Sequence, residues 1–97
     1  MILFYALYQM KEGKRREDFF RELQEADILA LTRKEEGNLF YDFAYSAEHQ
    51  QQVNLVEAWS SDEDLMAHKE TVQFFALQDI KAKYMESMQL KRFEVKE

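Results

Sequence analysis

The two histidines are the side chains of this sequence best suited to moving protons near neutral pH. His49 lies in the polar stretch 47–52, which predicts an exposed turn, so His68 is the candidate for proton transfer. Asp64, four residues earlier, is the carboxylate at helical spacing from His68, and such pairs usually belong to a solvated helix surface. We therefore expect no metal site. His68 either transfers a proton or is a hydrogen-bonded structural histidine.

Conventional catalytic constellations are missing from the sequence. It contains no cysteine, which excludes disulfides, thiolate nucleophiles and iron–sulfur clusters. Its two isolated glycines cannot form a phosphate-binding loop. Aromatic residues are abundant instead, with 8 Phe, 5 Tyr and the single Trp59. Trp59 ends a predicted strand, and a large aromatic side chain in that place is expected to anchor the hydrophobic core.

The elements that must position these residues follow the order β-α-β-β-α-β. Alternating apolar residues predict strands, and three- and four-residue spacing predicts helices. The predicted segments are a strand at 2–9, a helix at 14–34, a strand hairpin at 39–46 and 53–59, a short helix after a capping box at 60–63, a helix at 72–86 and a strand at 88–95. Gly37 suits the left-handed position after the first helix. The order predicts one ferredoxin-like α+β domain over residues 1–97, with an antiparallel sheet.

Large apolar groups occupy both faces of the first two predicted strands. A sheet with one wet face would alternate apolar and polar residues more cleanly. Two helices can cover only one face of the sheet, and the core of a single domain of this size is too small to bury so many aromatic rings. We therefore expect a homodimer in which a second copy covers the other face.

Charge and hydropathy exclude several classes of partner. The net charge is −6, whereas a nucleic-acid binder needs a basic stripe, so we expect no nucleic-acid partner. Residues 14–16 are basic, but two acidic residues follow at once, which is typical of a solvated helix start. The apolar opening is too short for a membrane span and lacks the pattern of a signal peptide. These features favour a cytoplasmic protein without a membrane partner.

Several stretches, taken in order, resemble the antibiotic biosynthesis monooxygenase family. They are residues 35–42 with a Glu-Gly-Asn run, 56–63 with a Glu-x-Trp run and an acidic cap, 65–69 with Ala-His, and Phe74 near the start of the last helix. The likeness spans nearly the whole chain. It implies a dimeric α+β barrel with a pocket between the sheet and the helices of each subunit.

The resemblance also implies a function. Family members oxidise phenolic or quinol-type substrates with molecular oxygen and need no metal or flavin, because the deprotonated substrate itself reduces oxygen. His68 would act as base or hydrogen-bond partner, and Asn38 would orient a substrate oxygen. The walls of the pocket would be formed by Trp59, Tyr41 and Phe74, with Glu57 as a further polar group.

Departures from two groups of relatives narrow this expectation. Heme-degrading relatives carry an asparagine where this chain has Ala6 and an axial histidine where it has Gln78, which disfavours heme degradation. An isomerase of a phosphorylated autoinducer sugar shows a second histidine where this chain has Gln73. Two alternatives to a monooxygenase therefore stay open, a small-molecule isomerase and a non-catalytic ligand-binding dimer.

Overall fold

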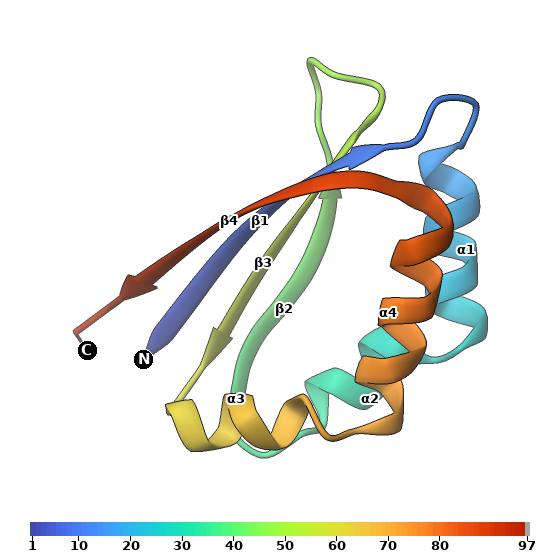
Figure 1. Ribbon diagram of the computed structural model, residues 1–97. Coiled ribbons are helices and arrows are strands. Elements are labelled where there is room, and N and C mark those ends of the chain that lie inside the picture. Colours follow the sequence, from blue (N-terminus) through green and yellow to red (C-terminus); the bar gives the residue numbers. More distant parts are fainter. Residues whose placement is uncertain (97) are drawn as a thin grey trace.

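A four-stranded antiparallel sheet, packed against helices on one face, forms the molecule (Figure 1). The computed structural model describes residues 1–96. Its elements are β1 (Ile2–Met10), α1 (Arg16–Glu25), α2 (Ile28–Arg33), β2 (Asn38–Tyr45), β3 (Gln52–Trp59), α3 (Asp62–His68), α4 (Val72–Tyr84) and β4 (Met85–Glu94). The strand order is β2-β3-β1-β4, and every neighbouring pair is antiparallel. The predicted ferredoxin-like α+β fold is confirmed.

The hydrophobic core lies between the sheet and the helices. Strand residues of one parity point into it, because side chains alternate across a strand. α1 contributes its buried side chains at a four-residue spacing, as an amphipathic helix requires. The buried cluster consists of Ala6, Tyr8, Met10, Phe19, Leu23, Ile28, Tyr41, Val53, Leu55, Leu77, Ile80 and Tyr84.

The prediction of one continuous helix at 14–34 is wrong, because this segment forms two helices, α1 and α2. Asp27 adopts a left-handed conformation with φ of 59° between them, which short polar residues tolerate better than most. The break rotates the buried face, so Ile28 is buried whereas Ala26 and Ala30, expected inside, are exposed. α2 thereby buries Ile28 and Thr32.

Two boundaries also differ from the prediction. The cap of α3 is shifted by one residue, since the hydroxyl of Ser61 accepts a hydrogen bond from the Asp64 backbone N–H. β4 begins at Met85, directly after α4, instead of at residue 88. It is an edge strand and is exposed over most of its length. The predicted break near residues 70 and 71 is confirmed, with Thr71 as the cap of α4.

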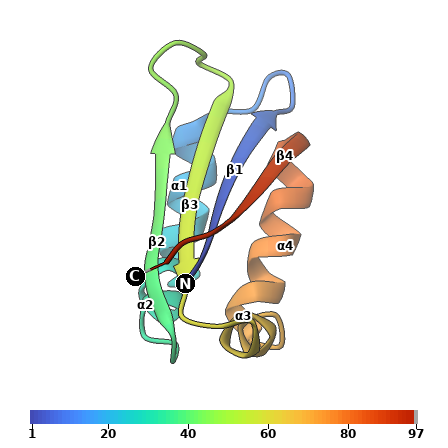
Figure 2. The ribbon, with the colours of Figure 1, turned by 90° about the vertical axis from the view of Figure 1, so that its left-hand side faces the viewer.

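The opposite face of the sheet carries no helix from residues 1–96, and Figure 2 looks directly onto it. Leu3, Tyr5 and Leu7 are half-buried in the middle of this face. Phe40 and Phe93, on the outer strands, are 48% and 49% exposed. The described residues include no helix that is both long enough and apolar enough to cross a membrane.

A pH effect on stability follows from the contact between α1 and the end of α4. The carboxylate of Glu22 accepts hydrogen bonds from the amine of Lys83 and the hydroxyl of Tyr84, which lower its pKa in the folded state. A lowered pKa stabilises the fold above the unfolded-state pKa of about 4.3, and this stabilisation is lost as the pH falls through the folded-state pKa. We expect wild type to lose its advantage over Glu22→Gln below about pH 4, measured by urea unfolding across pH. A constant difference between the two proteins would contradict this assignment.

Candidate active site

His68, the last residue of α3, forms a buried pair with a carboxylate. Its side chain is 4% exposed, and its Nδ1 lies 2.8 and 3.1 Å from the two carboxylate oxygens of Glu35. Glu35 lies between α2 and β2 and also accepts a hydrogen bond of 3.0 Å from the amide of Gln73. A carboxylate at Nδ1 fixes the proton on that nitrogen in the neutral imidazole, which leaves Nε2 as the proton acceptor.

Aromatic rings hold the imidazole of His68 on several sides. The indole of Trp59 lies against it with ring centroids 4.7 Å apart and an interplanar angle of 35°. Phe74 and Tyr41 meet it edge-on, with centroids at 5.3 and 6.2 Å. This packing restricts the ring to one orientation, so the His68–Glu35 pair is preorganised.

Glycine and serine residues bring the two halves of this pair together. Gly37 has φ of 82°, which lets the chain turn sharply from the loop of Glu35 into β2. Its carbonyl accepts a hydrogen bond of 2.8 Å from the backbone N–H of Ser60, just before α3. Asp64 accepts hydrogen bonds from the hydroxyls of Ser60 and Ser61. The carboxylate that contacts His68 is therefore Glu35, whereas Asp64 at the helical spacing binds the cap of α3.

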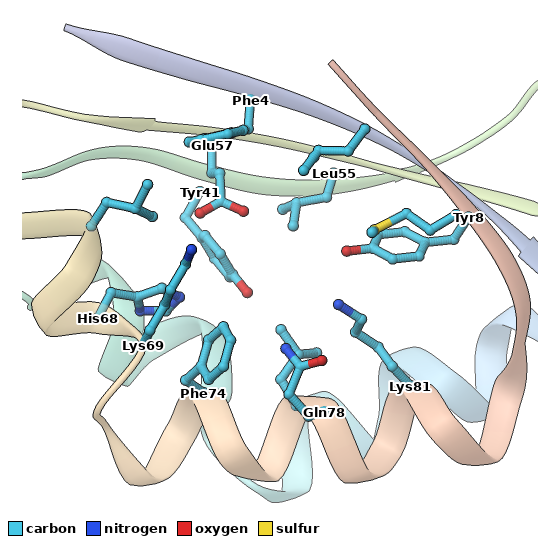
Figure 3. A pocket seen from close by; sticks show the side chains of 14 residues that line it. Phe4, Tyr8, Tyr41, Leu55, Glu57, His68, Lys69, Phe74, Gln78 and Lys81 are labelled. Carbon is cyan, nitrogen blue, oxygen red and sulfur yellow. The ribbon is translucent and has the colours of Figure 1, made fainter. Parts of the chain in front are cut away.

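A cavity of about 260 Å³ opens beside His68, between the sheet and α4 (Figure 3). Most of its wall is apolar or aromatic, as is usual for sites that bind small molecules. Its lining is Phe4, Tyr8, Tyr41, Leu55, Glu57, Leu65, His68, Lys69, Phe74, Leu77, Gln78, Lys81, Met88 and Leu90. Strand, α3 and α4 residues thus converge on one space.

A small set of polar groups faces this cavity. The hydroxyl of Tyr41 is buried and finds no hydrogen-bond partner within residues 1–96. Burial, and then the charge of Glu57, raise the pKa values of Tyr8 and Tyr41, so both remain phenols. Burial lowers the pKa of Lys81, an effect that Glu57 opposes. Glu57 itself accepts a hydrogen bond of 2.7 Å from the indole N–H of Trp59.

The structure brings four of the six sequence-predicted site residues to the cavity. His68, Tyr41, Glu57 and Phe74 line it. Trp59 is fully buried behind His68 and Glu57, so it supports their side chains without forming wall.

Asn38 does not line this cavity. It borders a shallow depression at the start of β2, and its amide donates a hydrogen bond of 3.2 Å to the carbonyl of Phe40. The register shift between Asn38 and Phe40 places the side chain there.

Sequence reasoning missed Glu35 and Lys81. Glu35 is 33 residues from His68 in the chain, and no periodic pattern connects a loop to the end of a helix. Lys81 belongs to α4, where charged residues are normally assigned to the solvated side.

The unpartnered hydroxyl of Tyr41 predicts an unusually small stability effect. Tyr41→Phe breaks no hydrogen bond to any of residues 1–96, so we expect the free energy of unfolding to stay within about 0.5 kcal/mol of wild type. Tyr84→Phe is the matched control, since its hydroxyl binds Glu22, and we expect this variant to be less stable than wild type. Urea unfolding of the two variants checks this, and equal destabilisation of both would refute it.

Three comparisons with known proteins bear on this fold and site. The sequence profile of the antibiotic biosynthesis monooxygenase family matches residues 1–79. No curated protein sequence matches the chain. Solved structures similar to it cover nearly its full length, so the match extends beyond the sheet and into the helices that form the cavity.

Two of these structures share a quarter or more of their residues with the chain. A proposed antibiotic biosynthesis monooxygenase from Nitrosomonas europaea is 25% identical, with 98% of each chain covered and a TM-score of 0.85. A conserved protein of unknown function from Bacteroides thetaiotaomicron, described as a possible oxidoreductase, is 29% identical, with 97% of this chain and 96% of that chain covered and a TM-score of 0.83. A Pseudomonas aeruginosa protein at 21% identity, with 99% and 94% covered and a TM-score of 0.84, adds support for the fold alone.

The fold is therefore that of a ferredoxin-like α+β protein with a cavity between sheet and helices. The chain belongs to the antibiotic biosynthesis monooxygenase family.

Proposed function

We propose that the protein is a cofactor-independent monooxygenase that oxidises a small phenolic or quinol-type substrate with molecular oxygen. The observation that carries the proposal is the buried Glu35–His68 pair at the wall of an aromatic cavity. The family membership and the description of the Nitrosomonas relative support the same class of reaction.

His68 is the general base of the proposed reaction. Its Nε2 accepts the proton of a substrate hydroxyl, and the carboxylate of Glu35 then stabilises the imidazolium that forms. A phenol becomes strongly reducing once it is deprotonated, so this one proton transfer prepares the substrate to react with oxygen. The Tyr41 hydroxyl, unpartnered within residues 1–96, is a donor for the substrate oxyanion.

The oxygen chemistry balances without any other reductant. The phenolate passes electrons to O₂, and a ring carbon forms a bond to the reduced oxygen. Cleavage of the O–O bond leaves one oxygen atom on the ring and releases the other as water with two substrate hydrogens. A quinol and O₂ thus give a hydroxyquinone and H₂O. The apolar walls limit access of water to the reduced oxygen species.

We also propose that the working unit is a homodimer in which two sheets pack face to face. The support is the apolar outer face of the sheet, with its half-buried Tyr5 and the exposed rings of Phe40 and Phe93. Such a cluster of exposed apolar groups is typical of an interface. Sedimentation at micromolar concentration should give a dimer mass, and Phe93→Glu should shift it toward monomer; a monomer mass for wild type would disprove it.

Oxygen uptake tests the proposed reaction. The purified, metal-free protein is mixed with a panel of quinols and polyphenols under ¹⁸O₂, and products are analysed by mass spectrometry. We expect one ¹⁸O atom per product and little peroxide. Stoichiometric H₂O₂ without label in the product would make the protein an oxidase. Absence of uptake across the panel would leave the isomerase and the ligand-binding dimer.

A further inference from the structure

The side chain of Lys81 extends from α4 into the cavity, and His68 lies on the other side of this cavity (Figure 3). Its amine lies 5.0 Å from the ring centroid of Tyr8. It forms no ion pair with any of residues 1–96, whereas Lys83, two residues later, binds Glu22 at 2.6 Å outside the cavity. A partly buried ammonium group with no direct ion pair to residues 1–96 is costly to the fold, and the charge of Glu57 opposes only part of that cost, which points to a ligand role.

The charges around the cavity have the opposite balance to the whole protein. Lys69 and Lys81 contribute two positive charges to the lining, and Glu57 contributes one negative charge. Glu35 is already paired with His68. The lining is therefore net positive by one charge, although the chain carries −6 overall. Such a local excess attracts an anion into the cavity.

Other groups near Lys81 are suited to the same anion. The hydroxyl of Tyr8 points into the cavity together with the Lys81 amine, and the Gln78 amide lies on the preceding turn of α4 (Figure 3). The Tyr8 hydroxyl stays protonated, because burial raises its pKa, so it is a donor. Donors and one cation around a common space match the acceptor oxygens of a carboxylate.

We propose that Lys81 binds an anionic substituent of the substrate, so that the substrate is a hydroxylated aromatic carboxylate with its hydroxyl at His68. This inference rests on the proposed function for the end at His68. Burial of Lys81 already removes part of the hydration of its ammonium group in the free protein. The negative charge of a bound carboxylate would compensate for that loss. The cavity of about 260 Å³ is smaller than most drug-sized sites, which favours one or two rings.

Binding of redox-inert ligands tests this without oxygen chemistry. The probes are two isosteric pairs, 4-hydroxybenzoate with 4-hydroxybenzamide and 6-hydroxy-2-naphthoate with 6-hydroxy-2-naphthamide, titrated by calorimetry under nitrogen. We expect wild type to bind at least one carboxylate about tenfold or more tightly than its amide. Lys81→Met should reduce this preference to within about twofold, and Lys81→Arg should retain most of it.

Lys83→Met is the matched control, because Lys83 lies on the same helix but binds Glu22 outside the cavity. It should keep the wild-type preference. Equal binding of acid and amide by wild type, no binding of either carboxylate at millimolar concentration, or an unchanged preference in folded Lys81→Met would each overturn the proposal. If the preference holds while oxygen uptake fails, the anion site stands and the monooxygenase proposal falls.

Discussion

Replacement of His68 by glutamine is expected to lower kcat for oxygen uptake by about 10²–10⁴-fold, the usual contribution of a positioned general base. Glutamine preserves much of the side-chain volume but cannot accept a proton from a phenol at neutral pH. Because the aromatic walls remain, KM should change only a few-fold. Steady-state oxygen consumption with the best quinol of the panel measures both constants.

His49→Gln provides the matched control for this experiment. His49 is exposed in the turn between β2 and β3, remote from the cavity lining, so its replacement should leave kcat and KM unchanged. Thermal unfolding of both variants establishes that they are folded. Full turnover by folded His68→Gln would remove His68 from the mechanism.

Glu35 is a positioning residue for the same reaction. Glu35→Gln keeps the shape of the side chain and can still accept a hydrogen bond from His68 Nδ1, but it removes the charge that stabilises the imidazolium. We expect kcat to fall about 10-fold or more with KM nearly unchanged. A loss confined to KM or to thermal stability would mean that Glu35 serves the fold alone.

Much of the fold follows from local patterns in the sequence. The short apolar run of β1, the alternation in β2, the cap before α3 and the glycine at position 37 each encode their element within a few residues, so the order of elements could be predicted. The break at Asp27 could not, because residues 14–34 keep a continuous apolar spacing. The break changes which residues face the core, since Ile28 is buried and Ala26 is exposed, and the packing of the whole fold determines this.

Some residues of the candidate site could be predicted from the sequence, and others could not. His68, Tyr41 and Phe74 could be found because residue type and family resemblance both single them out. The partner of His68 could not, since Glu35 comes close only after α2, β2 and α3 have packed. Lys81 also gives no sequence signal, because helix periodicity does not distinguish a cation facing a cavity from one facing solvent. Tertiary packing therefore determines the charges of the cavity.

Gly37→Ala is expected to cost about 2–5 kcal/mol of folding free energy, the largest stability effect among the predicted substitutions. Its φ of 82° lies in the left-handed region, where a Cβ costs about 1–2 kcal/mol. In addition, the new Cβ would overlap the carboxyl group of Asp64 and lie 2.5 Å from its Cβ. Asp64 is held by the cap of α3, so relief of the overlap requires the helix to move.

Gly13→Ala separates the two contributions. Gly13 has a nearly identical φ of 81°, but an added Cβ there meets no atom within 4 Å. We therefore expect Gly13→Ala to cost only the backbone strain of about 1–2 kcal/mol, measured by urea unfolding of both variants. Equal losses would show that Asp64 accommodates the methyl group without cost.

The overlap at Gly37 also predicts a loss of activity beyond the loss of stability. Gly37 is two residues from Glu35, and Asp64 is one helical turn before His68. A shift of α3 away from the loop lengthens the contact between Glu35 and His68, on which the proposed proton transfer depends. At a temperature where both glycine variants are folded, Gly37→Ala should therefore show a lower kcat for oxygen uptake than Gly13→Ala. Equal kcat values would mean that the site does not depend on how the loop and α3 pack.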